Sequence, residues 1–231
     1  MSAELVIKAI EEHADPLRAE HSMRFFKTAK GQYGYGDRFL GLTVPQMRTI
    51  AKAHRDLAIS DLELLLMSPI HEERLVALLI LVDQFGKYPE KRKQIFDFYL
   101  SHTKFVNNWD LVDLSAPRIV GIQLLHSNKS LLEKLAASDD LWEKRIAMVA
   151  TATFIKDEQL MPTLQIAEKL LGDKHDLIHK AIGWMLREVG KKDEAVLEKF
   201  LKKHIKQMPR TTLRYAIERF DESKRKHYLA M

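Results

Sequence analysis

The sequence predicts an all-α protein built from stacked helix pairs, and three observations predict this fold class. Apolar residues recur at the three- and four-residue spacing of amphipathic helices along nearly the whole chain. Glycine and proline, which interrupt helices, are scarce, with 9 and 7 among 231 residues. The hydrophobic fraction of 46% is enough for a continuous core. These features favour helices over a sheet-rich fold.

The expected helices follow one another with short connections. The apolar spacing predicts helices over residues 3–14, 16–29, 44–54, 59–67, 71–86, 89–102, 107–125, 128–137, 140–155, 157–171, 174–189, 193–203, 209–219 and 222–229. The one glycine-rich stretch, residues 31–37, lacks the Gly-Lys-Ser/Thr ending of a phosphate-binding loop, so we expect an ordered connection there.

Short signals mark several helix ends. Thr43 followed by Pro45 is typical of a helix start. Ser138 with the Asp139–Asp140 pair is expected to open the helix that carries Trp142, and Asp173 to open the next long helix. Gly172 and Gly190 fall where two helices are expected to end. These signals support several of the expected helix starts and ends.

The helices pair with a period of about 35 to 40 residues, which is the range of HEAT-like and armadillo repeats. Such pairs bury their apolar faces by stacking into a superhelix, an α-α solenoid whose concave face suits an extended polymer. No linker interrupts the pattern, so we expect a single HEAT-like repeat domain over residues 1–231.

Composition excludes several function classes. The chain has no cysteine, which rules out disulfides and thiolate chemistry and fits a reducing cytoplasm. We see no apolar run long enough for a membrane span. The ten histidines form no metal-binding pattern, and neither a nucleophile elbow nor a dinucleotide fingerprint occurs, so we expect no metal and no cofactor. A net charge of +5 is compatible with a nucleic-acid partner.

Three segments carry chemically informative residues. Trp109 and Asp113 are four residues apart, so they share a helix face on which an indole and a carboxylate can stabilise a cation. The alternative is a core tryptophan and an aspartate paired with an arginine. Arg145 has apolar neighbours at helical spacing and needs an acidic partner if buried, for which Asp113 and Asp110 are candidates. A structural ion pair between repeats is the alternative.

The third segment contains Trp184, which falls off the apolar stripe of its helix and lies between Lys180 and Arg187. Flanking cations suit phosphate and the indole suits a sugar or base. Packing of the indole against an adjacent repeat is the alternative.

Further cations occur in pairs one helical turn apart. The pairs are Arg48 with Lys52 and Arg210 with Arg214. We take all four as candidate DNA-binding residues, although a solvated charged face explains each pair equally well.

These segments resemble the AlkD-type DNA alkylation-repair glycosylases. The resemblance rests on GLTVPQMRTIAK at 41–52, WDLVD at 109–113, SDDLWEKR at 138–145 and KAIGWMLRE at 180–188. The match covers most of the chain in the same order with similar gaps. Departures occur at Asn108, where some members have tryptophan, and at Asp176 and Leu177, where some have an aromatic pair.

The resemblance implies a monofunctional glycosylase that hydrolyses the N-glycosidic bond of N3- and N7-alkylated purines in double-stranded DNA, without flipping the base into a protein pocket. By position, Asp113 would be the catalytic carboxylate, Trp109 and Trp184 would flank the deoxyribose, and Arg145 would support Asp113. Residues at backbone-binding positions of the family are Arg48, Lys52 and Arg187.

Such an enzyme would act in base excision repair, as a cytoplasmic, nucleoid-associated monomer that needs no cofactor. Two other functions remain open from the sequence. One is a non-catalytic DNA-binding or damage-sensing protein of the same fold, and the other is a protein-interaction scaffold.

Overall fold

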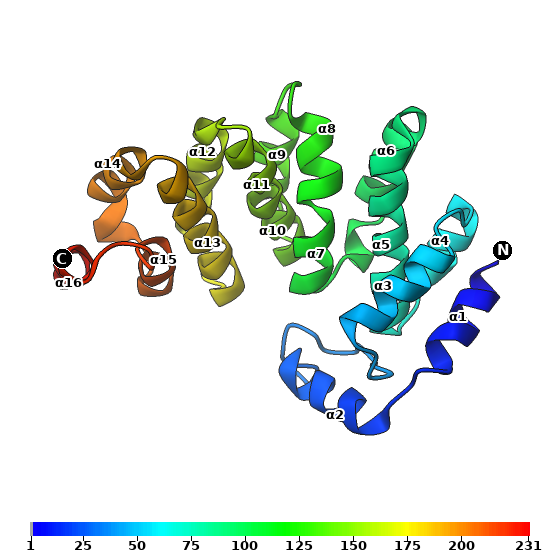
Figure 1. Ribbon diagram of the computed structural model, residues 1–231. Coiled ribbons are helices and arrows are strands. Elements are labelled where there is room, and N and C mark those ends of the chain that lie inside the picture. The colour runs from blue at the N-terminus through cyan, green and yellow to red at the C-terminus, as the bar shows by residue number, and fades with distance from the viewer. Residues whose placement is uncertain (1) are drawn as a thin grey trace. The chain divides into compact units, whose positions relative to one another are not determined.

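The computed structural model describes residues 2–231, and helices joined by loops and turns make up the fold in this range (Figure 1). The predicted all-α class of paired helices is therefore confirmed. Pairing of extended backbone within the described range is limited to an isolated parallel bridge between Arg38 and Ile70. The chain divides into two compact units, which meet in sequence at Ser115 and Ala116. The single repeat domain expected over 1–231 stays a prediction.

The first unit is built around one long helix. Its elements are α1 (Ala3–Glu11), α2 (Pro16–Phe25), α3 (Val44–Ala53), α4 (Ile59–Leu66), α5 (His71–Lys87), the short 3₁₀ turn η1 (Pro89–Lys91), α6 (Arg92–Ser101), a second turn η2 (Thr103–Phe105) and α7 (Trp109–Ser115). Helix α5 contacts α1, α3, α4, α6 and α7. It is apolar around most of its circumference, which is the pattern of a helix buried on all sides.

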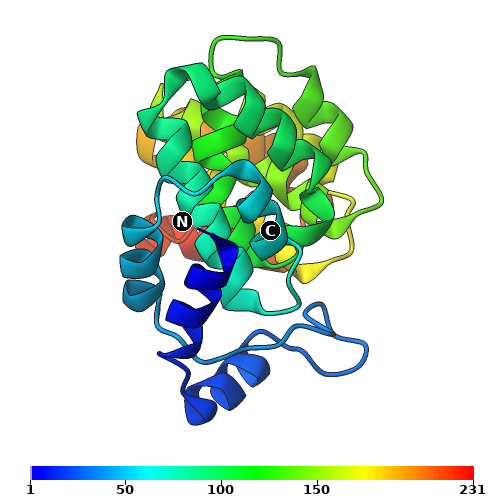
Figure 2. The same ribbon diagram turned by 90° about the vertical axis from the view of Figure 1, so that its right-hand side faces the viewer.

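The connection between α2 and α3 is the long loop of this unit. Helix α2 was expected to reach residue 29 but ends at Phe25, and Lys27 has a positive φ of 54°. Figure 2 shows the following segment as an extended loop in lighter blue after the blue helix α2. Gly41 has a φ of +88°, and a Cβ there would lie 2.2 Å from the Asp15 carbonyl oxygen. Only glycine therefore fits where this loop returns to the unit.

The second unit also has a central helix. Its elements are a π-type turn η3 (Pro117–Gly121), α8 (Ile122–Leu124), α9 (Ser130–Ala136), α10 (Leu141–Ala150), α11 (Ala152–Lys156), α12 (Leu160–Leu170), α13 (Asp176–Lys192), α14 (Glu194–His204), the 3₁₀ turn η4 (Ile205–Gln207), α15 (Arg210–Ala216) and α16 (Glu222–Ala230). Helix α13 contacts α10, α11, α12, α14 and α15.

Helix α13 confirms the predicted apolar stripe. Ile178, Ile182, Met185 and Val189 are all fully buried. The prediction that a helix ends at Gly190 is wrong, because α13 continues to Lys192. A Cβ at that glycine would lie 2.5 Å from a methyl carbon of Leu197 on α14, so the Leu197 side chain would have to move. The glycine therefore serves helix packing and not helix termination.

Two predicted helices are interrupted. The helix expected over 107–125 stops at Ser115, because Pro117 has no amide hydrogen to continue the ladder. The chain passes through η3, in which the Gly121 amide donates to the Ala116 carbonyl oxygen at 2.9 Å. The helix expected over 140–155 is split at Thr151, whose hydroxyl donates to the Met148 carbonyl oxygen at 2.6 Å.

Two predicted helix starts are confirmed. Thr43 and Gln46 form a capping box at the start of α3. Of the Ser138–Asp140 group, Asp140 is the capping residue, and its carboxylate accepts hydrogen bonds from the Trp142 and Glu143 amides at the start of α10. The start expected at Asp173 is wrong, because α13 begins at Asp176 with His175 as its capping residue. From residue 2 onward, no helix combines the length and apolar character needed to cross a membrane.

Candidate functional site

Trp109 lies in a cluster of aromatic rings in the first unit. Its half-buried indole stacks on Phe26, with ring centroids 5.3 Å apart and planes 23° from parallel. Phe25 contacts the indole edge-on at 5.9 Å and leaves 57% of its own surface exposed. Phe26 also stacks on Phe39 at 5.0 Å. The alternative of a fully buried core tryptophan does not hold, because this indole keeps part of its surface accessible.

A buried charge network lies against the same rings. His71, the first residue of α5, stacks on Phe39 with centroids 4.5 Å apart. Its Nδ1 lies 3.3 Å from the Asp37 carboxylate, and its Nε2 lies 2.8 Å from Asp110 Oδ2 on α7. Arg74 Nη2 lies 2.7 Å from the other Asp37 oxygen. We call His71, Arg74, Asp37 and Asp110 the His71 network.

The network shifts the ionisation of its members. Burial alone lowers the pKa of His71, but the charge and hydrogen bond of Asp110 and the hydrogen bond to Asp37 raise it to about 9. Burial alone raises the pKa of Asp37, but the hydrogen bond from His71 and the charge of Arg74 outweigh that effect and hold this pKa below its usual value. Two carboxylates and two cations therefore balance in the interior.

Asp113 lies one turn after Trp109 on α7. The residue is partly exposed and is not part of the fully buried core. Tyr99, fully buried nearby, has a raised pKa because of burial and, to a smaller extent, the negative charge of Asp113. The Tyr99 hydroxyl makes a 3.0 Å hydrogen bond with Ser115, the last residue of α7. The end of α7 is thereby anchored while Asp113 keeps access to solvent.

Trp184 lies in the second unit, on α13. The indole is half-buried, as its place off the apolar stripe predicts. It lines a pocket of about 440 Å³ together with Ala152, Ile155, Lys156, Met185, Glu188, Lys191 and Lys192. Lys191 lies 2.8 Å from Glu188 and Lys192 lies 3.6 Å from Glu158, so an anionic ligand beside this indole would have to compete with these carboxylates.

Arg145 is buried on α10, as its apolar neighbours predict. Its Nη1 donates a 2.7 Å hydrogen bond to the Leu177 carbonyl oxygen near the start of α13. That contact links α10 to α13 within the second unit. Of the two acids considered as partners, Asp110 is engaged by His71, and a pairing of Arg145 with Asp113 stays a prediction.

The predicted DNA-binding cations differ in accessibility. Arg48 and Lys52 are exposed on α3 and line a surface pocket of about 290 Å³ with Arg55 and Asp83. In the second unit, Arg214 is exposed on α15. The neighbouring cation on that helix, Arg210, is exposed as well but donates to the Leu229 carbonyl oxygen at 2.7 Å.

The two cations predicted to flank Trp184 are both paired with carboxylates. Lys180 lies 2.7 Å from Asp176 Oδ2, one turn earlier on α13. Arg187 contacts Glu188 at 3.3 Å and forms a second ion pair with Glu218. A phosphate at either position would have to compete with these carboxylates.

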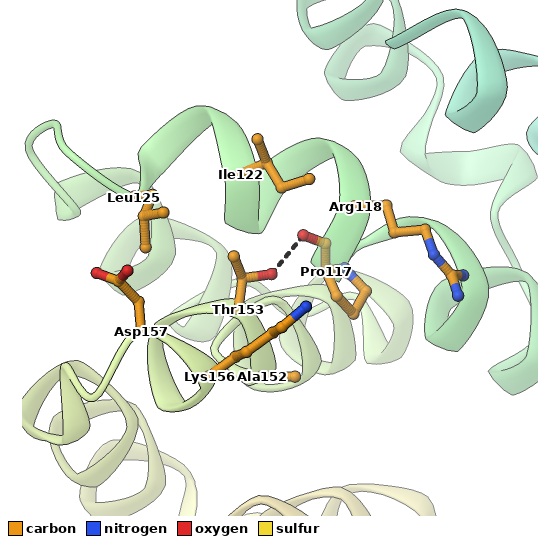
Figure 3. A pocket seen from close by; sticks show the side chains of 8 residues that line it. All are labelled: Pro117, Arg118, Ile122, Leu125, Ala152, Thr153, Lys156 and Asp157. Atoms are coloured by element: carbon orange, nitrogen blue, oxygen red, sulfur yellow. Dashed lines mark hydrogen bonds between the residues drawn. The ribbon is translucent and has the colours of Figure 1, made fainter. Parts of the chain in front are cut away.

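A further pocket of the second unit contains none of the predicted site residues. It has a volume of about 540 Å³, and Figure 3 shows Arg118 and Ile122 on one wall and Thr153 and Lys156 on the other. The Thr153 hydroxyl donates to the Pro117 carbonyl oxygen at 2.6 Å. This bond satisfies a carbonyl group at the irregular turn η3.

Sequence reasoning missed most of the His71 network. The sequence suggests Asp110 only as a partner for Arg145, and it places Asp37 in an ordered loop. The signal was the run from His71 to Arg74, four polar residues in succession directly before the apolar stretch Leu75–Val82, all four of them buried. Clusters of three or more metal-ligating side chains are absent from residues 2–231.

Comparisons with known proteins bear on the family of the chain. The sequence model of a family described as DNA alkylation repair enzymes matches residues 6–220. A solved structure described as a predicted DNA alkylation repair enzyme from Enterococcus faecalis superimposes with a TM-score of 0.70 at 16% identity, covering 91% of this chain and 98% of that one. At this identity the likeness concerns the fold alone. Among curated proteins, none matches.

Proposed function

The chain belongs to the DNA alkylation repair enzyme family, and from this premise we propose that it is a DNA glycosylase for cationic N3- and N7-alkylated purines in duplex DNA. The observation that carries the proposal is the pairing on α7 of an accessible carboxylate, Asp113, with a half-buried indole one turn earlier, Trp109. An acid and an aromatic face on one helix side suit a reaction that builds positive charge on a sugar.

The proposed reaction is a hydrolysis at C1′ of the damaged nucleotide. Alkylation places a positive charge on the purine, so the base leaves with the bonding electron pair and needs no protonation. The sugar develops oxocarbenium character, which the Asp113 carboxylate stabilises. A water oxygen then forms the new bond to C1′, and its proton passes to Asp113 or to solvent. Neutral, undamaged purines are poor leaving groups and are not released at a useful rate.

Trp109 contributes a π-face to this site. An indole attracts the positive charge on the sugar directly, and by excluding water it also strengthens the attraction of that charge to the carboxylate. Trp184 is assigned the same kind of contact with the nucleotide, supported by its accessible ring among lysines. Arg145 is assigned the support of the catalytic carboxylate on the basis of the family resemblance.

Cations on the surface are assigned to the DNA backbone. The set consists of Arg48, Lys52, Lys180, Arg187, Arg210 and Arg214. Phosphate contacts of this kind orient a duplex without reading its sequence, which fits an enzyme that recognises a lesion by its charge.

The test is release of 7-methylguanine from methylated duplex DNA, measured under single-turnover conditions. Asp113→Asn keeps the side-chain shape and removes the charge, so the rate should fall about 100-fold, the effect of losing one well-placed electrostatic group. Asp97→Asn is the matched control, since Asp97 is an exposed carboxylate of the same unit that pairs with the exposed Lys93 at 2.6 Å.

Equal rates for Asp113→Asn and the wild type would remove Asp113 from the mechanism. Salt-dependent binding of duplex DNA without any base release would indicate a damage-sensing protein instead. Absence of both binding and release would favour an interaction scaffold.

A further inference from the structure

We propose that His71, held as an imidazolium between two aspartates, is a positioning residue that fixes the start of α7 and the Trp109 indole. The inference rests on the proposed function only for its effect on base release. Its structural part concerns contacts within the first unit and stands on the geometry described above.

Both ring nitrogens of His71 face a carboxylate oxygen. The Nδ1 contact is to Asp37 at 3.3 Å, and the Nε2 contact is to Asp110 at 2.8 Å. A neutral imidazole has one N–H and one bare nitrogen, so it would turn a lone pair toward one of these oxygens. A doubly protonated ring donates to both. The two contacts therefore select the charged form.

The surroundings hold that charge in place. The His71 side chain is 2% exposed and that of Asp37 is 5% exposed, so water cannot replace either partner. Arg74 supplies the second cation on α5, next to Asp37. Glu72, the next residue of α5, accepts hydrogen bonds from the Leu40, Gly41 and Leu42 amides. The charged groups that face the imidazole are therefore Asp37, Asp110 and Arg74.

Two routes lead from His71 to Trp109. The first is covalent, because Asp110 follows Trp109 in sequence and lies in the first turn of α7. The Asp110 carboxylate also accepts the Leu111 amide at 2.9 Å, so its bond to His71 holds the helix start itself. The second route is through packing, because the His71 ring contacts Phe26 at 5.1 Å and Phe26 stacks on the indole.

Asn108 completes the arrangement. It is fully buried, its amide nitrogen lies 3.4 Å from Asp37, and its amide oxygen accepts the Trp109 backbone N–H at 2.8 Å. The residue that precedes the indole and the residue that follows it are thus both tied to the His71 network. Loss of the imidazolium charge leaves two carboxylates with one cation, so Asp110 is released first, being the more exposed of the two at 20%.

The structural test uses the full-length protein labelled with 5-fluorotryptophan. Its three tryptophans give three fluorine resonances, assigned with single Trp→Phe variants. On titration from pH 7 to 10.5, the Trp109 resonance should shift with a midpoint near pH 9, where His71 loses its proton. The Trp184 resonance, from the other unit, should show no such midpoint.

Two variants assign the transition. His71→Gln should shift the Trp109 resonance already at pH 7 and abolish the midpoint near 9. His102→Gln is the matched control, because His102 also binds a carboxylate, Glu63, at 2.9 Å but has no contact with α7 among the described interactions. It should leave the transition unchanged.

A measurement on the wild type alone guards against a variant that fails to fold. Nitrogen-15 spectra of the histidine rings at pH 7 should show both nitrogens of His71 protonated. A single ring proton, a Trp109 resonance that does not respond up to pH 10.5, or a transition that survives in His71→Gln would each overturn the proposal.

Base release adds the functional readout. At pH 7, His71→Gln should slow single-turnover release by about tenfold, the cost of a small misplacement of reacting groups. Duplex affinity should change less than twofold, because no cation on the surface is altered. A fall in affinity with an unchanged rate would contradict positioning. If the wild type releases no base, the proposed function fails, and the fluorine and nitrogen spectra still decide the role of His71.

Discussion

The two units hold their candidate tryptophans in different ways. In the first unit, the Trp109 ring stacks on Phe26 and its backbone is tied to buried, balanced charges. In the second unit, Trp184 projects from the side of α13, whose apolar stripe is fully buried against its neighbours. One indole is oriented by electrostatics and aromatic stacking, the other by the regular geometry of a packed helix.

This difference sets how each region responds to change. Removing one partner of a buried charge network lowers the stability of the fold, since the other charge is then buried without compensation. A packed helix is destabilised when a larger side chain is introduced on the face that contacts its neighbours. The first unit should therefore be sensitive to charge and pH, and the second to volume.

The largest expected effect is the loss of a buried cation. Arg74→Ala leaves the Asp37 carboxylate with one cation fewer, which should lower the free energy of unfolding by about 3 kcal/mol or more. The ion pair it removes has side chains 4% and 5% exposed. Chemical denaturation at pH 7 measures the change.

Lys144→Ala provides the comparison in the second unit. Lys144 lies 2.9 Å from Asp173, but the two side chains are 23% and 11% exposed, so water can solvate the remaining aspartate. The expected loss is about 1 kcal/mol. Equal losses for the two variants would show that burial does not distinguish the ion pairs.

The second expected effect is a pH dependence of stability from His71. Its pKa rises from 6.5 to about 9 on folding, so the stabilisation is complete below pH 6.5 and is lost as pH rises through 9. The shift corresponds to about 3 kcal/mol as an upper figure for a coupled buried group. Unfolding free energies at pH 7 and 10 should differ more for the wild type than for His71→Gln; parallel pH profiles would contradict this source of stability.

The third effect concerns volume in the second unit. A Cβ at Gly183 of α13 would lie 2.5 Å from the Tyr215 Cβ and 2.6 Å from the Thr212 carbonyl oxygen on α15. Gly183→Ala should therefore cost about 2 kcal/mol of stability. Gly86→Ala is the matched control, because no atom lies within 4 Å of its Cβ position in α5. That change should stabilise by about 0.5 kcal/mol, the helix preference of alanine over glycine.

The smallest expected effect is on the salt dependence of duplex DNA binding when single surface cations are removed. Arg48 is exposed on α3, whereas Arg187 is already paired with Glu188 and Glu218. Arg48→Ala should reduce the slope of log affinity against log salt by about 0.9, the loss of one phosphate contact. Arg187→Ala should reduce it less, since its carboxylates offset part of the charge. A slope unchanged by Arg48→Ala would remove that residue from the DNA surface.

Local patterns in the sequence were enough to predict the helices and several of their ends. Apolar spacing located α5 and α13, and the capping residues Thr43 and Asp140 stand at helix starts as expected. Interruptions were harder to predict. Pro117 could have been read as a helix break, but Thr151 breaks its helix through a hydroxyl contact that any threonine in a helix can make or omit.

The candidate site divides in the same way. Trp109 and Asp113 share one face of α7 because they are four residues apart. Trp184 lies off the apolar stripe of α13 because its spacing from the stripe residues does not follow the helical period. By contrast, Asp37 and Asp110 are separated by more than seventy residues. The residues around either aspartate in the sequence do not indicate that both contact the same histidine.

By itself, then, the amino-acid order determined the helical class and the core faces, and it supplied the candidate site residues. Only the tertiary structure decided that His71 is enclosed by two carboxylates and that Arg187 is already occupied. The physical reason is that helix periodicity is set by neighbours three and four positions away, whereas the energy of a buried charge depends on groups that folding alone brings within 3 Å.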